Sequence, residues 1–407
     1  MLNRNINNLF FILFAIIPIS IIAGSAISLI NILLIDFLFL ILIIFKKDYS
    51  FIKSDVIKYL FILYIYLLFN SFISIDQSVG FSRNFGFLRF IILFVAFNYF
   101  FKEKYFLKNV LITWTLILSF ILIDIFFESF MGRNLIGFGE TGPYQNRVVS
   151  FFKDEPIVGG YINAFYLIII GFLFANFKDQ NKKFISIFSI IFLIAIIVTG
   201  ERSNSIKAFL GLLILYLFMK EYDLKKKITF VISTVFILSV LIFNSQYLKL
   251  RFVTQIKSHM SEDQIYFKLY KSGFEVFKNH KLFGVGNKNY RIEACLNKSL
   301  DKEKKNIYHC NSHPHQVYFE ILSEHGIVGS IFILFILYKI IFSKIIYVLK
   351  QQNYIQMGSL IYIIVSFVPF LPSGAFFGDY MLTLFMINIA VFYSSNQKLN
   401  IFNQKNL

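Results

Sequence analysis

The residues best suited to chemistry lie in one stretch, HCNSHPHQVYFEILSEHGIVG (residues 309–329). Proline is well placed in the first turn of a helix, because the N–H that it lacks would have no partner there. The sequence therefore predicts a helix over residues 314–325, capped by Ser312 or His313 and ended by the glycine that follows. This helix would lead directly into an apolar run long enough to cross a membrane.

His315 would lie in the first turn of that helix. The positive end of the helix dipole disfavours a protonated imidazole, so the side chain should stay neutral and could act as a general base. Two other interpretations remain open: His315 could be a solvated surface residue, or it could join His309, Cys310 and His313 as a metal ligand. The metal site is disfavoured because the segment has no Cys-x-x-Cys or His-Glu-x-x-His spacing. No metal or other cofactor is therefore predicted.

A second stretch, TGERSNSIKA (residues 199–208), places Arg202 at the end of an apolar run, directly after Glu201. Charged residues at the edge of a membrane are costly and tend to be functional, although Arg202 could instead extend to the interface or be neutralised by Glu201. Guanidinium groups match phosphate oxygens through paired hydrogen bonds. Arg202 would form an anion site if it met other arginines in one cleft, and the candidates, which could also be ordinary surface charges, are Arg147, Arg251 and Arg291.

The composition places these residues in a membrane protein. Of the 407 residues, 57% are hydrophobic and only 15% are charged, which is more apolar surface than a soluble domain of this length can bury. The formal net charge of +17 would suggest a nucleic-acid partner in a soluble protein, but lysines in cytoplasmic loops account for it in a membrane protein. We therefore expect an all-α integral membrane protein in contact with lipid, without nucleic acid.

Apolar runs close to the roughly 20 residues that a membrane-spanning helix needs occur about twelve times. The first two follow each other closely and are interpreted as a helical hairpin rather than as a cleaved signal peptide. The predicted runs cover residues 9–23, 25–45, 56–75, 83–101, 106–127, 159–177, 184–199, 204–219, 228–243, 327–347, 355–371 and 375–393.

Lysines gather in every second connection between these runs, for example at Lys46 and Lys47. The positive-inside rule places these connections and both termini in the cytoplasm. Two long connections, 128–158 and 244–325, then lie on the opposite side, which in a bacterial inner membrane is the periplasm, and long loops on a rigid scaffold often carry function. The predicted parts are membrane helices at 1–243, a large periplasmic loop with short helices at 244–325, and the last spans with a cytoplasmic tail at 326–407.

Both cysteines of the chain, Cys295 and Cys310, fall in the larger loop. In an oxidising compartment we expect a disulfide between them. It would close a loop of about 15 residues and stabilise the protein by about 3 kcal/mol. The alternative is a pair of free thiols, which can also be buried.

The larger loop shows no sign of a nucleotide-binding site. The glycine-rich segment LFGVGNKNY (residues 282–290) is not followed by the Gly-Lys-Ser/Thr of a nucleotide-binding loop. It is interpreted instead as a turn after a helix over residues 265–278. The predicted outer face also has no paired aspartates to hold a metal and a sugar nucleotide, which favours a lipid-linked donor.

Three segments, TGERSNSIKA, FEVFKNHKLFGVGNKNYR (residues 274–291) and HCNSHPHQVYFEILSEHGIVG, resemble, in this order and topology, the O-antigen ligase/polymerase superfamily of bacterial inner membranes. The resemblance covers about residues 144–329. It implies a GT-C-like membrane enzyme that transfers a glycan from undecaprenyl pyrophosphate without a metal. The implied acceptor is a lipid A–core oligosaccharide for a ligase, or another lipid-linked repeat unit for a polymerase.

The resemblance also implies roles for single residues. His315 matches the histidine that activates the acceptor hydroxyl, and Gln316 follows it where Asn is more usual. Arg202 matches a pyrophosphate-binding arginine, and Arg251 is chosen as the second one. A related position often carries Arg before the periplasmic helix, but residues 263–264 of this chain are Asp-Gln.

Four further residues are possible supporting groups. Glu324 matches the family pattern, and we expect it to have a structural or acceptor-positioning role. The others are Arg147, Arg291 and His313.

Three other functions compete with an O-antigen ligase. A repeat-unit polymerase differs only in its acceptor. A transporter or flippase for polysaccharides or lipid-linked glycans would need a continuous polar path through the membrane, and a structural subunit would need no cleft. An enzyme requires instead that His315 and Arg202 face one cavity that opens outward.

Overall fold

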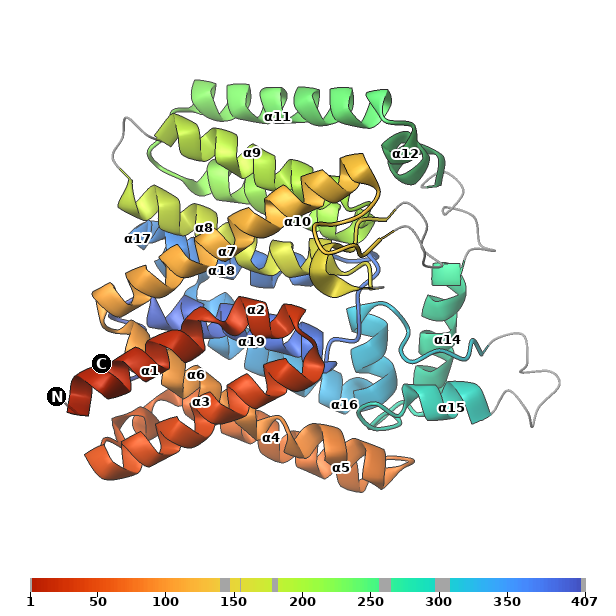
Figure 1. The fold of residues 1–407 in the computed structure, drawn as a ribbon. Helices are drawn as coiled ribbons and strands as arrows, with labels where there is room; N and C mark the ends of the chain where they lie inside the picture. The colour runs from red at the N-terminus through yellow and green to blue at the C-terminus, as the bar shows by residue number, and fades with distance from the viewer. Residues whose placement is uncertain are drawn as a thin grey trace.

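The computed structural model describes residues 2–139, 147–153, 155–177, 182–255, 265–296 and 308–403, and these residues form helices joined by loops, without a strand among them. The expected all-α class is therefore confirmed for them. Most of the long helices run side by side in one direction or its reverse, and both termini lie at the same end of this bundle (Figure 1). Helices α14 and α15 lie beyond its other end.

Every predicted apolar run falls mainly in a helix, and seven helical segments are long and apolar enough to cross a membrane. Together with the shorter apolar helices they make the chain an integral membrane protein, whereas about twelve crossings remain a prediction. The main helices are α1 (Leu2–Ala15), α2 (Ile17–Ile22), α3 (Ser25–Lys46), α4 (Asp55–Phe72), α5 (Gln77–Phe85), α6 (Leu88–Phe101), α7 (Lys104–Met131), α8 (Val158–Asn176), α9 (Lys182–Val198), α10 (Arg202–Phe218), α11 (Leu224–Asn244), α12 (Gln246–Lys249), α14 (Ile265–Asn279), α15 (Tyr290–Leu296), α16 (Val317–Ile340), α17 (Ile345–Gln351), α18 (Tyr354–Ser366) and α19 (Asp379–Ser394).

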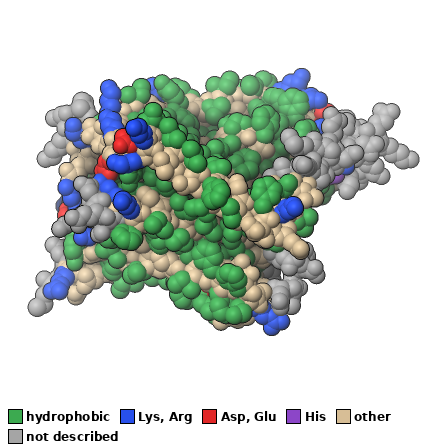
Figure 2. All heavy atoms as spheres, turned by 90° about the horizontal axis from the view of Figure 1, so that it is seen from above, with side chains coloured by type: hydrophobic (Ala, Val, Ile, Leu, Met, Phe, Trp, Pro, Cys, Tyr) green, Lys and Arg blue, Asp and Glu red, His purple; other side chains and the backbone are tan. Residues whose placement is uncertain are grey.

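The outer surface of the bundle is apolar. Figure 2 shows hydrophobic side chains across the middle of one face, with most Lys and Arg side chains toward its two ends. Helix α11 is the extreme case, since only 11% of its most apolar 18-residue stretch is buried inside the protein. Large exposed side chains such as Ile232 and Phe236 would be unfavourable in water but are compatible with lipid.

The connection between α18 and α19 differs from the prediction. The apolar runs suggested that only residues 372–374 separate two helices, but residues 367–378 lie outside both of them. Pro369 and Pro372 explain the difference, because proline removes a backbone N–H and disfavours helical geometry in the residue before it. The result is a non-helical loop at the end of the bundle.

The helix predicted over residues 265–278 is present as α14, and it packs on the start of α16. Gly273 makes this close contact possible, because a Cβ atom there would lie 2.8 Å from Pro314 and 3.1 Å from Phe319. The disulfide between Cys295 and Cys310 is also present. It joins α15 to the segment before α16, so α14, α15 and that segment are held together.

Candidate functional site

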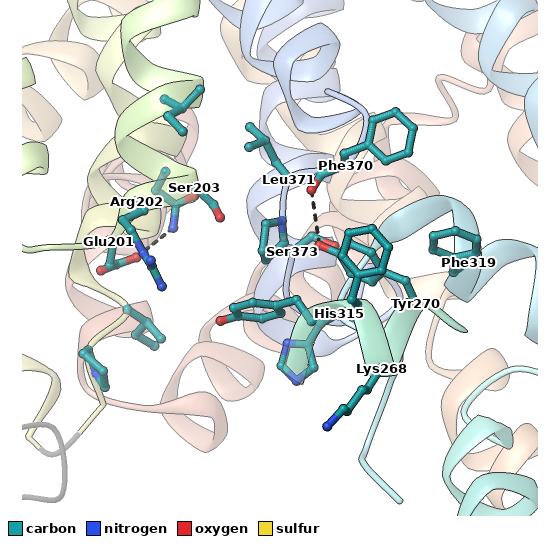
Figure 3. Close-up of a pocket in the computed structure, with 18 of the residues that line it drawn as sticks. Glu201, Arg202, Ser203, Lys268, Tyr270, His315, Phe319, Phe370, Leu371 and Ser373 are labelled. Carbon is teal, nitrogen blue, oxygen red and sulfur yellow. Dashed lines mark hydrogen bonds between the residues drawn. The ribbon is translucent and has the colours of Figure 1, made fainter. Parts of the chain in front are cut away.

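A cavity of about 1360 Å³ lies between the first turn of α10, helix α14 and the loop before α19. It is lined from segments that are far apart in the sequence, and Figure 3 shows Arg202 on one side and His315 on the other. The residues that line it include Arg147, Glu201, Arg202, Arg251, Tyr266, Lys268, Tyr270, Lys271, Phe274, His315, Phe319 and Phe370.

One side of the cavity, the arginine wall, is formed by Arg147, Arg202 and Arg251. Arg202 is the first residue of α10. Arg147 comes from the connection before α8 and donates to the carbonyl oxygen of Pro156 at 3.1 Å. Arg251 follows α12. Three of the four candidate arginines therefore line one cavity, and Arg291 is not among its lining residues.

Glu201 fixes the position of the arginine next to it. Its carboxylate accepts hydrogen bonds from the backbone N–H groups of Gly159 (2.6 Å) and Gly160 (3.1 Å) and from the side chain of Asn204 (2.7 Å). Negative charge is favourable at the N-terminus of a helix, here that of α8. Burial raises the pKa of Glu201, and these hydrogen bonds act in the opposite direction. Glu201 thus joins the start of α10 to the start of α8.

Gly200 positions the third arginine. Its φ of 74° lies in the left-handed region, and a Cβ atom there would collide with the hydroxyl group of Tyr247. Its carbonyl oxygen accepts hydrogen bonds from Nε (3.2 Å) and Nη2 (2.8 Å) of Arg251, whose Nη1 donates to Gln255 at 2.8 Å. The motif TGERSN therefore organises the arginine wall through its backbone as well as its side chains.

His315 lies on the opposite side of the cavity, in the loop that precedes α16. The residue has a left-handed φ of 55°, and its carbonyl oxygen accepts a hydrogen bond from the backbone N–H of Ser373 at 2.8 Å. The ring centroid of Tyr266 is 5.9 Å away, in an edge-to-face arrangement. Burial lowers the pKa of His315, so its neutral form is favoured.

The helix that follows His315 begins later than predicted. It starts at Val317 rather than Pro314, so His315 precedes the helix and does not lie in its first turn. Neither Ser312 nor His313 caps it. Gln316 does so, because its side-chain oxygen accepts from the N–H groups at positions 318 (2.8 Å) and 319 (3.1 Å). The expected break at Gly326 is present, since helical geometry is interrupted there.

This cap gives a first testable prediction. Replacing Gln316 with alanine should leave two backbone N–H groups without their acceptor and destabilise the start of α16 by about 1 kcal/mol. Amide hydrogen exchange at residues 318 and 319 should become faster, whereas Gln316→Asn, which keeps a side-chain carbonyl, should lose less protection. Unchanged exchange in the alanine variant would mean that Gln316 does not stabilise the helix.

The other predicted supporting residues lie outside the lining of the cavity. His313 is buried behind His315, with 3.9 Å between the two ring centroids, and burial lowers its pKa to about 4. Glu324 is buried in α16 and accepts a hydrogen bond from the backbone N–H of Tyr290 at 3.4 Å. Arg291 is exposed on α15. Residues 263–264 lie outside the described residues.

The four possible metal ligands do not form a site among the described residues. Cys310 is in the disulfide with Cys295, which removes it from the set with His309, His313 and His315. Within the part of the chain that the structure describes, no three His, Cys, Asp or Glu side chains are grouped so that they could hold a metal ion.

Helix α14 contributes a part of the cavity lining that was not predicted from the sequence. Tyr266, Tyr270 and Phe274 are spaced by four residues and therefore share one face of this helix, and Lys268 and Lys271 also line the cavity. The hydroxyl group of Tyr270 donates to the carbonyl oxygen of Phe370 at 3.3 Å (Figure 3). The four-residue spacing was visible in the sequence, but the partner of that face was not.

Comparison with known families finds a match over part of the chain. Residues 187–334 match the family model described as O-Antigen ligase. The matched segment includes Arg202, Arg251 and His315 but not Arg147. A comparison with curated proteins finds no significant match.

Proposed function

We propose a glycosyl-transfer reaction for this chain, because it belongs to the O-antigen ligase/polymerase superfamily through its domain at residues 187–334. The proposed donor is a glycan on undecaprenyl pyrophosphate, and the proposed acceptor is a hydroxyl group of lipid A–core oligosaccharide or a similar glycan. The reaction would take place at the periplasmic face of the bacterial inner membrane, with both termini of the chain in the cytoplasm.

One observation carries this proposal: His315 and the three arginines line the same cavity. A base on one side and an anion site on the other are the two groups that transfer from a pyrophosphate requires. The arginines suit the pyrophosphate, because several guanidinium groups can bind its oxygens through paired hydrogen bonds. Because the three arginines are partly buried, they also interact with a charged ligand more strongly than they would in water.

In the proposed step, His315 removes the proton from the acceptor hydroxyl as its oxygen attacks the anomeric carbon of the donor. The bond from that carbon to the pyrophosphate oxygen breaks, and undecaprenyl pyrophosphate leaves with the electron pair. The arginine wall stabilises the negative charge that develops on it. Attack opposite the leaving group inverts the anomeric configuration. No protonation of the leaving group is needed, so a single base is sufficient.

The lowered pKa of His315 predicts the pH dependence of this step. A pKa below the usual 6.5 keeps the base neutral to more acidic pH, so kcat/KM should be constant at and above neutral pH. It should fall only as the pH drops through the lowered pKa. The measurement is a pH–rate profile with donor binding followed in parallel. A rate that is already half lost at pH 6.5 or above would contradict the assignment of the base.

Genetic complementation tests the proposed function. His315→Ala and Arg202→Ala would be expressed in a strain that lacks its own copy of the gene, and its lipopolysaccharide would be separated on a gel. We expect both variants to insert into the membrane but to lose polymer attached to lipid A–core. Matched controls are His280→Ala and Arg291→Ala, since neither residue lines the cavity, and both should behave like the wild type.

The gel also separates the competing functions. Loss of long chains, with single repeat units still attached to the core, would indicate a repeat-unit polymerase. Full activity in both the His315 and the Arg202 variant would favour a transporter or a structural subunit over a transferase.

A further inference from the structure

Residues 367–378, the loop between α18 and α19, contribute part of the cavity lining through Phe370, Leu371, Pro372, Ser373 and Gly374. Figure 3 shows Ser373 across the cavity from Arg202. The backbone N–H of Ser373 donates to the carbonyl oxygen of His315 at 2.8 Å. The α18–α19 loop is therefore in direct contact with the backbone of the proposed base.

Glu320 joins the same loop to α16. Its carboxyl oxygens accept hydrogen bonds from the backbone N–H groups of Phe376 at 2.9 Å and Phe377 at 3.4 Å. Glu320 is 2% exposed and lies in the first turn of α16, shortly after His315 in the chain. A buried carboxyl group is unfavourable unless it is hydrogen-bonded. The two backbone N–H groups meet this need, and in doing so they fix the loop relative to the start of α16.

These hydrogen bonds close a ring with the covalent chain. From His315 the chain leads through the start of α16 to Glu320, whose carboxyl group holds the N–H of Phe376. From Phe376 the chain leads back to Ser373, whose N–H holds the carbonyl oxygen of His315. Within this ring His315 has a left-handed φ of 55°. Such a conformation is unfavourable for a residue with a side chain and persists only where the surrounding contacts enforce it.

We propose that Glu320 is a positioning residue for His315: it holds the α18–α19 loop where Ser373 keeps the backbone of His315 in the conformation that directs the imidazole into the cavity. A base must lie within hydrogen-bond reach of the proton that it removes, and a displacement of about 1 Å can lower a rate by about 10²-fold. Glu320 does not line the cavity, so it acts on the substrate only through His315. The inference rests on the proposed function for the role of His315 as the base.

The place of the imidazole can be measured without any substrate. The full-length protein in phosphatidylcholine nanodiscs would be treated with diethyl pyrocarbonate at a series of pH values, and the labelling of each histidine would be quantified by mass spectrometry. This reagent reacts with the neutral imidazole, so the profile for His315 gives its pKa. Burial lowers that pKa in the wild type, and we expect a midpoint below the usual 6.5. In Glu320→Ala the imidazole should become more exposed, and the midpoint should rise toward 6.5.

Steady-state kinetics of the same variants separate positioning from donor binding. We expect Glu320→Ala to lower kcat by about 10- to 100-fold. Its affinity for undecaprenyl pyrophosphate should stay within about twofold of the wild type, because the arginine wall lies on the other side of the cavity. Glu320→Gln keeps the size and one acceptor oxygen, so it should recover part of the rate and part of the lowered pKa of His315. This isosteric variant also keeps the test valid if the alanine variant folds poorly.

The matched control is Tyr318→Phe. Tyr318 is also in the first turn of α16, and its hydroxyl group donates to the carbonyl oxygen of Phe367 at 2.7 Å, at the far end of the same loop from Phe376. This variant should keep the labelling profile of His315 and a kcat within about twofold of the wild type.

Two results would overturn the inference. The first is a labelling profile of His315 that is the same in the wild type and in both Glu320 variants. The second is a Tyr318→Phe variant that changes this profile as much as Glu320→Ala does, since any loosening of the loop would then have the same effect. A protein without transfer activity, in which the His315 profile still depends on Glu320, would support the positioning role and contradict only the proposed function.

Discussion

Replacing His315 with alanine is expected to lower the rate of glycosyl transfer by about 10²–10⁴-fold, the usual contribution of a positioned base. The acceptor hydroxyl would then have to lose its proton to water. The side chain is partly buried in a loop outside the helices, so the substitution should leave the fold unchanged. The effect should fall on kcat, because the base acts in the transition state and not in donor binding.

Two further variants make this result specific. His315→Gln keeps polarity and approximate size but cannot accept the proton, so it should be as inactive as the alanine variant. His313→Ala removes the neighbouring ring, whose centroid is 3.9 Å away, and should cost much less activity. A protein that is inactive without His313 but active without His315 would reverse the assignment.

Replacing Arg202 with alanine is expected to lower kcat by about 10²–10³-fold, as when one donor that stabilises developing negative charge is removed. Donor affinity should weaken as well, because the pyrophosphate already carries charge before the reaction. Arg202→Lys should recover part of the lost rate, since lysine keeps the charge but not the paired hydrogen bonds.

The matched control for this variant is Arg291→Ala, which removes an exposed arginine outside the cavity. Its kinetic constants should stay within about twofold of the wild type, as for most surface substitutions. Steady-state assays at several donor concentrations would separate the effect on kcat from the effect on the KM for the donor. An Arg202→Ala enzyme with normal kcat and normal donor KM would remove this residue from the anion site.

Much of the fold could be predicted because the signals are local. An apolar run long enough for a membrane-spanning helix becomes helical in lipid, because its backbone groups must be hydrogen-bonded within the segment there. The position of α14 followed from the same kind of local pattern. The disulfide followed from the number of cysteines and their shared loop.

The start of α16 could not be predicted, because two local preferences compete there. Pro314 favours the first turn of a helix, but the backbone at His315 adopts a left-handed φ of 55° that a helix does not allow. Gln316 then supplies the cap through its longer side chain. Tertiary contacts hold this arrangement, including the hydrogen bond from the N–H of Ser373 to the carbonyl of His315.

The cavity itself was predictable only in part. Arginines and a histidine in separate loops indicated an anion site and a base, but sequence spacing does not tell which of several charged residues share one space. The structure brings Arg147 to the cavity and leaves Arg291 outside it. It also adds one face of α14, whose partner across the cavity, the loop at residues 370–374, comes from about 100 residues further along the chain.

One measurement tests the central claim most directly. The purified protein would be incubated with an undecaprenyl-pyrophosphate-linked glycan and lipid A–core oligosaccharide in the presence of a chelator, and the products followed by mass spectrometry. We predict equal amounts of free undecaprenyl pyrophosphate and of glycan joined to the acceptor, with inverted anomeric configuration, and neither product with His315→Ala. Release of the carrier lipid without a glycosylated acceptor, or transfer that continues without His315, would contradict the account.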